Sequence, residues 1–195
     1  MSSSRDVVER RREVLRLVYD NFLHSLDGLP PERLWERPGH GLPTGQAGFP
    51  IARLVGHVRD AIVFWLWREG EEPPPAIERG ASLETILESF EQVRGRLDAV
   101  LASASDADLK AVWPSAAPVR LGLPARLPDG QAGQAGAPAP SRGEPITLGF
   151  ISKRLMQHAL YHGAQIDYIR SMGEEGWGRG RTYWEESVDA VSECP

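Results

Sequence analysis

The strongest helical pattern in the sequence lies in residues Thr147 to Met172, TLGFISKRLMQHALYHGAQIDYIRSM. At 3.6 residues per turn, its apolar side chains fall on one stripe, which predicts a long amphipathic helix. The stripe consists of Leu148, Ile151, Leu155, Ile166 and Ile169. His158 and His162 lie in the middle of that stripe, one turn apart. A buried polar group without a partner costs roughly 1–3 kcal/mol, so these two imidazoles need a ligand or hydrogen-bond partners.

Three earlier segments carry the same helical period. We expect helices from Asp6 to about Leu26, from Pro50 to before Gly70, and from the capping residue Ser82 to about Ala102. Residues 104–109 are expected to form a frayed end of the third helix or a short extra turn. Together with the helix that begins at Thr147 and stops at Gly173, these segments give four long helices and no strong strand. The pattern predicts an all-α protein, a four-helix bundle.

A Pro-, Gly- and Ala-rich segment, residues 112–145, separates the third and fourth helices. It contains too little apolar surface to offset the entropy of ordering it, so we expect a long, flexible crossover with a short strand pair near residues 119–121 and 125–127. The C-terminal tail, residues 174–195, is glycine-rich but carries three aromatic residues, Trp177, Tyr183 and Trp184. We expect this tail to pack back on the body or on a second subunit. Residues 1–195 are interpreted as one domain.

The overall composition excludes several classes of partner. The 195 residues are 41% hydrophobic and 25% charged, as in ordinary soluble proteins, and the net charge of −5 with no dense basic patch argues against nucleic acid or an anionic membrane. Arg10 to Arg12, beside two glutamates, are interpreted as a solvated helix face. The sequence has no apolar run of membrane-spanning length and no signal peptide. Its one cysteine, Cys194, is expected to be frayed and not a nucleophile, and a chain without an internal disulfide fits the cytoplasm.

The histidines carry the chemistry that the sequence predicts. The spacing of His158 and His162 allows both rings to bind one metal ion. His57 lies at the flank of the second helix, where we expect it to be buried or half-buried at a helix–helix contact. If the second and fourth helices are neighbours, three imidazoles converge there. Three nitrogen ligands with one open coordination position are typical of a catalytic or ligand-binding metal. Imidazole binds Zn, Ni, Cu and Fe, so the ligand set alone does not determine which metal is bound. The alternative is that the rings are hydrogen-bonded core residues. His24 and His40 are expected to be exposed.

The residues around the pair narrow the chemistry. Helical zinc proteases place a glutamate directly after the first histidine as general base, and Ala159 occupies that position here, which disfavours such a protease. Gln157 and Gln165 flank the pair and are suited to orient a ligand or a metal-bound water, although neither can act as a base. Tyr161 lies about 60° from His158 and about 100° from His162 around the helix, and it reaches only the rim. The nearest carboxylate, Asp60, is interpreted as a surface acid rather than a partner of an imidazole.

Three segments resemble the DinB/YfiT-like family. They are IARLVGHVRDAIVFWL (Ile51 to Leu66), HALYHGAQIDYIRSMG (His158 to Gly173) and the connection LDGLPPERLWERPG (Leu26 to Gly39). The resemblance implies a four-helix bundle that binds a divalent metal ion such as Zn, Ni or Fe. The metal ligands that it implies are His57, His158 and His162. The chain departs from many relatives at Phe49-Pro50, where they have a polar Asn-Ser pair.

The resemblance also implies a range of functions. Some relatives are metal-dependent transferases or isomerases that use a low-molecular-weight thiol, such as bacillithiol or mycothiol, as a co-substrate. A thiol S-transferase acting on a small-molecule substrate is therefore one hypothesis, and a metal-dependent hydrolase is a variant of it. A non-catalytic protein that binds a metal or a small molecule, or serves in assembly, is the second, and a metal-free structural protein is the third. Pairing through exposed helix faces predicts a homodimer.

Overall fold

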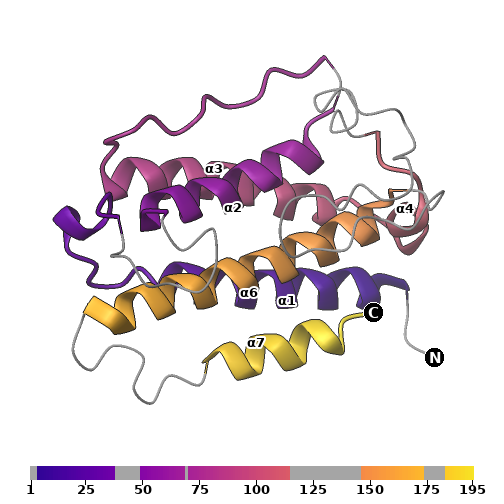
Figure 1. The fold of residues 1–195 in the computed structure, drawn as a ribbon. Helices are drawn as coiled ribbons and strands as arrows, with labels where there is room; N and C mark the ends of the chain where they lie inside the picture. The colour runs from indigo at the N-terminus through magenta and orange to yellow at the C-terminus, as the bar shows by residue number, and fades with distance from the viewer. Residues whose placement is uncertain (1–3, 38–48, 69, 115–145, 174–182) are drawn as a thin grey trace, which may run out of the picture.

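A computed structural model describes residues 4–37, 49–68, 70–114, 146–173 and 183–195 (Figure 1). Within them lie six α-helices and one short 3-10 helix, and the described residues contain no strand beyond an isolated bridge between Val112 and Thr147. The helices are α1 (Ser4–His24), α2 (Ile51–Leu66), α3 (Leu83–Ala102), α4 (Asp106–Lys110), α6 (Leu148–Gly173) and α7 (Tyr183–Ser192), and η1 spans Pro31–Arg33. The prediction of an all-α protein is confirmed.

The four long helices pack around one core. α1 packs against α6 and α3, and α2 packs against α3 and α6. Figure 1 shows that α2 and α3 run in one direction and α1 and α6 in the other, with residues 70–82 returning along the outside of the molecule. α2 and α6 are therefore antiparallel neighbours, which brings residues far apart in sequence to the same level. The predicted crossover, residues 112–145, is described only at 112–114; the rest of it and the predicted strand pair fall in 115–145, outside the described residues.

The helix boundaries follow from local capping. The Ser82 side chain accepts a hydrogen bond from the Thr85 backbone N–H at 3.1 Å, and Thr147 Oγ1 accepts one from the Phe150 N–H at 3.1 Å. Both satisfy backbone donors that the first turn of a helix leaves unpaired. Pro50, predicted as the first residue of its helix, stands one position before it. The two caps predicted from sequence therefore begin α3 and α6 as expected.

The short helix α4 is a separate element, where the sequence suggested a frayed end or an extra turn. Ser105 and Asp108 form a reciprocal capping box, in which each residue's side chain bonds the other's backbone N–H. Leu109 is buried, and α4 packs against α6 and α1. Its contacts help to fix the N-terminal half of α6.

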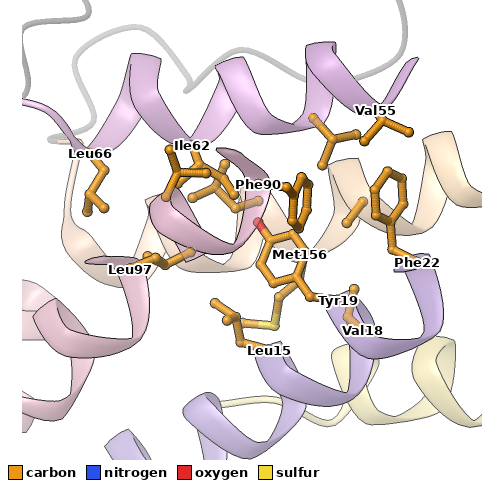
Figure 2. Close-up of a cluster of buried hydrophobic side chains, with 14 of the residues drawn as sticks. Leu15, Val18, Tyr19, Phe22, Val55, Ile62, Leu66, Phe90, Leu97 and Met156 are labelled. Carbon is orange, nitrogen blue, oxygen red and sulfur yellow. The ribbon is translucent and has the colours of Figure 1, made fainter. Parts of the chain in front are cut away.

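Apolar side chains from the four long helices fill the core (Figure 2). At its centre, the Phe90 ring of α3 stacks on Phe22 of α1 with centroids 5.4 Å apart, and it meets Tyr19 edge-on at 5.5 Å. The predicted apolar stripe of α6 is buried throughout; its members are Leu148, Ile151, Leu155, Ile166 and Ile169. Burial of this stripe fixes the rotation of α6 about its axis, and therefore the direction in which its histidines point.

The interpretation of Arg10 to Arg12 as a solvated face is wrong for two of the three residues. Arg11 is buried, and its Nη1 donates to the Gly149 carbonyl at 2.8 Å and to Ser152 Oγ at 3.0 Å. Arg12 is half-buried and pairs with Asp98 of α3. The local charge pattern misleads because α1 is covered by α6 on one side and by α3 on the other.

The end of the C-terminal tail packs back on the body, which confirms one of the two arrangements expected for it. α7 lies against α1 and α6, the Trp184 indole N–H donates to the Asp167 carboxylate, and a Cβ added at Gly163 would meet the Trp184 ring at 2.1 Å. The expectation that Cys194 is frayed is wrong, since only 3% of it is exposed. Cys194 lies two residues after the end of α7 and is buried. Trp177 and the Tyr183 side chain lie outside the described part.

None of the described helices is both long and apolar enough to cross a membrane.

Candidate metal centre

Two antiparallel helices bring three histidines together. His57 comes from α2, and His158 and His162 come from consecutive turns of α6. The Nε2 atom of His158 lies 3.1 Å from Nε2 of His57 and 3.0 Å from Nε2 of His162. The candidate ligand atoms all lie within 4.8 Å of one another. This group is called the three-histidine cluster below, and it joins residues 101 positions apart in the sequence.

Burial decreases across the cluster. His162 is buried, His158 is half-buried, and His57 is exposed, so the expectation that His57 would be at least half-buried is not met. Its position on the flank of α2 places it at the outer edge of the contact with α6, although its ring still meets both other rings at centroid distances of 4.7 and 4.8 Å. The cluster is therefore anchored in the protein at His162 and opens to the surface at His57.

Gln165 determines which nitrogen of His162 carries the proton. Nδ1 of His162 lies 2.7 Å from Oε1 of Gln165. An amide oxygen only accepts hydrogen bonds, so Nδ1–H is the donor, and the Nε2 lone pair of the neutral ring points into the cluster. The sequence suggested that Gln165 would orient a ligand or a water, and the structure shows it holding a histidine. Gln157, the other flanking glutamine, is exposed.

The environment keeps the imidazoles neutral. Burial, with the neighbouring histidines and Arg154, lowers the pKa of His158 to about 3. Burial also lowers the pKa of His162 to about 4, against an opposing effect of the Gln165 hydrogen bond. The pKa of His57 is lowered too, mainly because its ring is partly desolvated where it lies against the other two rings. Neutral rings at pH 7 have one lone pair each that can bind a metal ion.

Hydrogen bonds among the rings do not account for the geometry of the cluster. Both short contacts involve the same atom, Nε2 of His158, which carries either one proton or one lone pair. Nε2 of His162 carries a lone pair, so a proton on Nε2 of His158 can be donated to His162. The contact of the same atom with Nε2 of His57 is then left without a good hydrogen bond. Two nitrogens at about 2.0–2.1 Å from one ion are roughly 2.9–3.4 Å apart, and the observed 3.0 and 3.1 Å agree with this. The spacing of these two nitrogen pairs therefore fits a shared metal ion.

Nδ1 of His158 lacks the kind of hydrogen bond that Nδ1 of His162 makes. This atom is buried and has no hydrogen-bond partner among the described residues. Histidine ligands of metals usually donate from their second nitrogen to an acceptor, as His162 does here. The two α6 histidines are therefore held differently, His162 by a hydrogen bond and His158 by packing.

The other residues predicted near the site lie as follows. Tyr161 is exposed, and its ring meets the His162 ring at a centroid distance of 5.0 Å, which confirms its place at the rim. Asp60 is exposed and pairs with Arg59 at 2.7 Å, so it is the surface acid that the sequence suggested. Ala159 is buried. His24 is exposed as expected, and His40 falls outside the described residues.

Sequence reasoning missed Arg154. It is half-buried one turn before His158, and it contributes to the lowered pKa of that histidine. The signal that could have identified it is its spacing, since positions 154, 158 and 162 recur every four residues on one face of a helix.

A family model described as the DinB superfamily matches residues 15–166, a span that contains all three histidines. Comparisons with curated proteins and with solved structures give no significant match.

Proposed function

Because the chain belongs to the DinB superfamily, we propose that His57, His158 and His162 bind one divalent metal ion and that the protein is a metal-dependent thiol S-transferase. The observation that carries the proposal is the convergence of three imidazole nitrogens within 4.8 Å of one another. Zn, Ni and Fe all accept imidazole ligands, so the proposal names a divalent ion without selecting one.

Three protein ligands suit a reactive site better than a structural one. Structural zinc sites are closed by four protein ligands, whereas catalytic sites keep a position for water or substrate. Among the described residues, the only His, Cys, Asp or Glu side chains grouped closely enough to share an ion are the three histidines. The exposed His57 places the open side of the site toward the surface, where a small molecule can reach it.

The chain's own residues would position the ion and keep one side of it accessible. A divalent ion in such a site lowers the pKa of a thiol that occupies its remaining position, and so favours the thiolate nucleophile near pH 7. Gln165 holds His162 in the tautomer that directs Nε2 inward. The buried stripe of α6 keeps His158 and His162 on the side that faces α2.

Among the described residues, no carboxylate belongs to the three-histidine cluster, which favours thiol transfer over hydrolysis. Hydrolytic metal sites commonly use a carboxylate as general base beside the ion. The carboxylate one turn past His57, Asp60, is exposed and paired with Arg59, and Ala159 stands where the helical zinc proteases have a glutamate. A thiol whose pKa is lowered by a bound divalent ion would lose its proton to the buffer and would need no such base.

The test is a reaction between thiols and a chromogenic aryl halide. In this reaction a C–S bond forms, the C–halogen bond breaks, the halide leaves and the thiol proton passes to the buffer. We expect metal-loaded protein to accelerate the reaction for at least one low-molecular-weight thiol, and His162→Ala to abolish the acceleration. Tyr161→Phe, which changes only the rim, is the matched control and should retain metal binding.

Two outcomes separate this proposal from the alternative of a non-catalytic protein. Metal binding without turnover across the thiol panel would favour a module that binds a metal or a small molecule. A protein that takes up no metal would overturn both and favour histidines with a purely structural role. Pairing into a homodimer stays a prediction, and sedimentation of the purified protein tests it.

A further inference from the structure

The face of α6 that carries the histidines extends beyond them toward the N-terminus of the helix. Phe150, Arg154 and His158 follow at intervals of four residues, so their side chains lie above one another on this face. Both ends of this row touch α2. The Phe150 ring lies 6.3 Å from the Trp65 ring, and Nε2 of His158 lies 3.1 Å from that of His57.

These two contacts fix the level of Arg154 against α2. In an antiparallel pair, residue numbers on the two helices change in opposite directions, and the pairs 65–150 and 57–158 share one register. Arg154 therefore lies opposite Ala61, whose small side chain is half-buried. The contact between α2 and α6, which we call the α2–α6 seam, thus has an aromatic end, a guanidinium in the middle and the three-histidine cluster beyond it.

Arg154 differs from the fully buried arginines of this protein. Arg11, Arg59 and Arg170 each donate to two or three acceptors. In the part of the chain that the structure describes, the half-buried Arg154 makes neither a hydrogen bond nor an ion pair. The guanidinium nitrogens are open to solvent, and an anion supplied from solution can replace water there with charge-assisted hydrogen bonds.

We propose that Arg154 binds a carboxylate of the substrate or thiol whose other end occupies the metal position at the three-histidine cluster. This inference rests on the proposed function, because it uses the metal as the second anchor. One helical turn separates Arg154 from His158, a rise of about 6 Å. A ligand with two or three carbon atoms between its metal-binding atom and its carboxylate spans that distance.

The chemistry of the seam suits a monoanion with an apolar portion. The planar fork of a guanidinium matches a carboxylate with two parallel hydrogen bonds, and a single cation balances a single negative charge. Phe150 and Trp65, both half-buried, provide an apolar surface on the far side of Arg154 from the histidines.

The experiment compares two thiols that share the thiol end, one with a charged carboxylate at the other end and one with a neutral methyl ester. Protein loaded with Co²⁺ is titrated with 3-mercaptopropionate and with its methyl ester, and binding is followed by the sulfur-to-cobalt absorption band. We expect the ratio of the two affinities to fall about tenfold in Arg154→Gln relative to the wild-type protein, because one charge-assisted contact is lost. Comparing ratios cancels the intrinsic difference between the two thiols.

Two variants act as controls. Arg154→Lys keeps the charge without the fork and should retain part of the preference for the acid. Lys153→Gln removes the same charge at the neighbouring position on a different face of α6, and it should leave the ratio unchanged. Since Arg154 makes no bond in the described structure, Arg154→Gln should unfold at the same temperature as the wild-type protein or higher, whereas a structural role would lower that temperature.

The outcomes distinguish this inference from the proposed function. Failure to bind Co²⁺ would overturn the metal site and this inference with it. Uptake of Co²⁺ together with an affinity ratio that is the same in the wild-type protein and in Arg154→Gln would overturn the role of Arg154 alone. An equal loss in Lys153→Gln would assign the effect to general charge, and would also overturn it.

Discussion

The replacement Gln165→Leu tests how the protein holds its candidate metal centre. It removes the acceptor that lies 2.7 Å from Nδ1 of His162, a residue that is only 2% exposed. Without metal, the ring can move its proton to Nε2 and bond to its neighbours, so the loss is small. With metal, Nε2 is engaged and the buried Nδ1–H stays unpaired, at roughly 1–3 kcal/mol. We therefore expect metal affinity to fall about 10- to 100-fold, as for other residues that orient metal ligands.

Competition with a chromophoric chelator measures this change directly. The matched control is Gln157→Leu, which makes the same substitution at an exposed position on the same helix and should alter the affinity less than twofold. If the two variants weaken metal binding equally, or if Gln165→Leu binds as tightly as the wild-type protein, Gln165 does not orient a metal ligand.

Three further predictions concern stability and are each checked by chemical denaturation. Gly149→Ala should destabilise the protein by about 1–3 kcal/mol, because the new Cβ would stand 2.8 Å from the Leu109 carbonyl oxygen. Gly95→Ala is the control: a Cβ there meets no atom within 4 Å, so the change should stabilise the helix by about 0.5–1 kcal/mol. Tyr19→Phe should be neutral or stabilising by about 1 kcal/mol, since the buried hydroxyl has no hydrogen-bond partner among the described residues; a loss of stability would show that it has one. Two arginines of α1 lower the pKa of Asp98 below its ordinary 3.8, mainly by hydrogen bonding, so its ion pairs stabilise the fold above that pH and are lost as the pH falls through the lowered pKa. The difference in unfolding free energy between wild type and Asp98→Asn, about 1 kcal/mol near pH 6, should therefore disappear in strong acid, and a constant difference would contradict the assignment.

The long helices were predictable because several local signals agree within each of them. The apolar stripe of α6 gives its length and its buried side, and Thr147 marks its start. Ser82 does the same for α3. His158 and His162 could be paired from sequence alone because four residues make one turn of the same helix.

Features that depend on packing between distant segments were harder to predict. The helical period placed His57 at the flank of its helix and overestimated its burial. Its distance from His158 depends on how α2 and α6 pack, which the period does not give. Arg11 appeared solvated because its neighbours in sequence are charged, whereas its neighbours in space belong to α6. α7 was missed in a glycine-rich tail, although Trp184, Ser187, Val191 and Cys194 recur at helical spacing.

Metal content is the measurement that tests the central claim most directly. Protein purified without added metal is analysed for its elements, alongside His162→Ala, with circular dichroism to establish that the variant stays helical. We predict about one equivalent of a divalent transition metal per chain in the wild-type protein, and none in the variant. A wild-type protein that contains no such metal, takes up neither Zn²⁺ nor Ni²⁺, and unfolds at the same temperature with and without chelator would contradict the account.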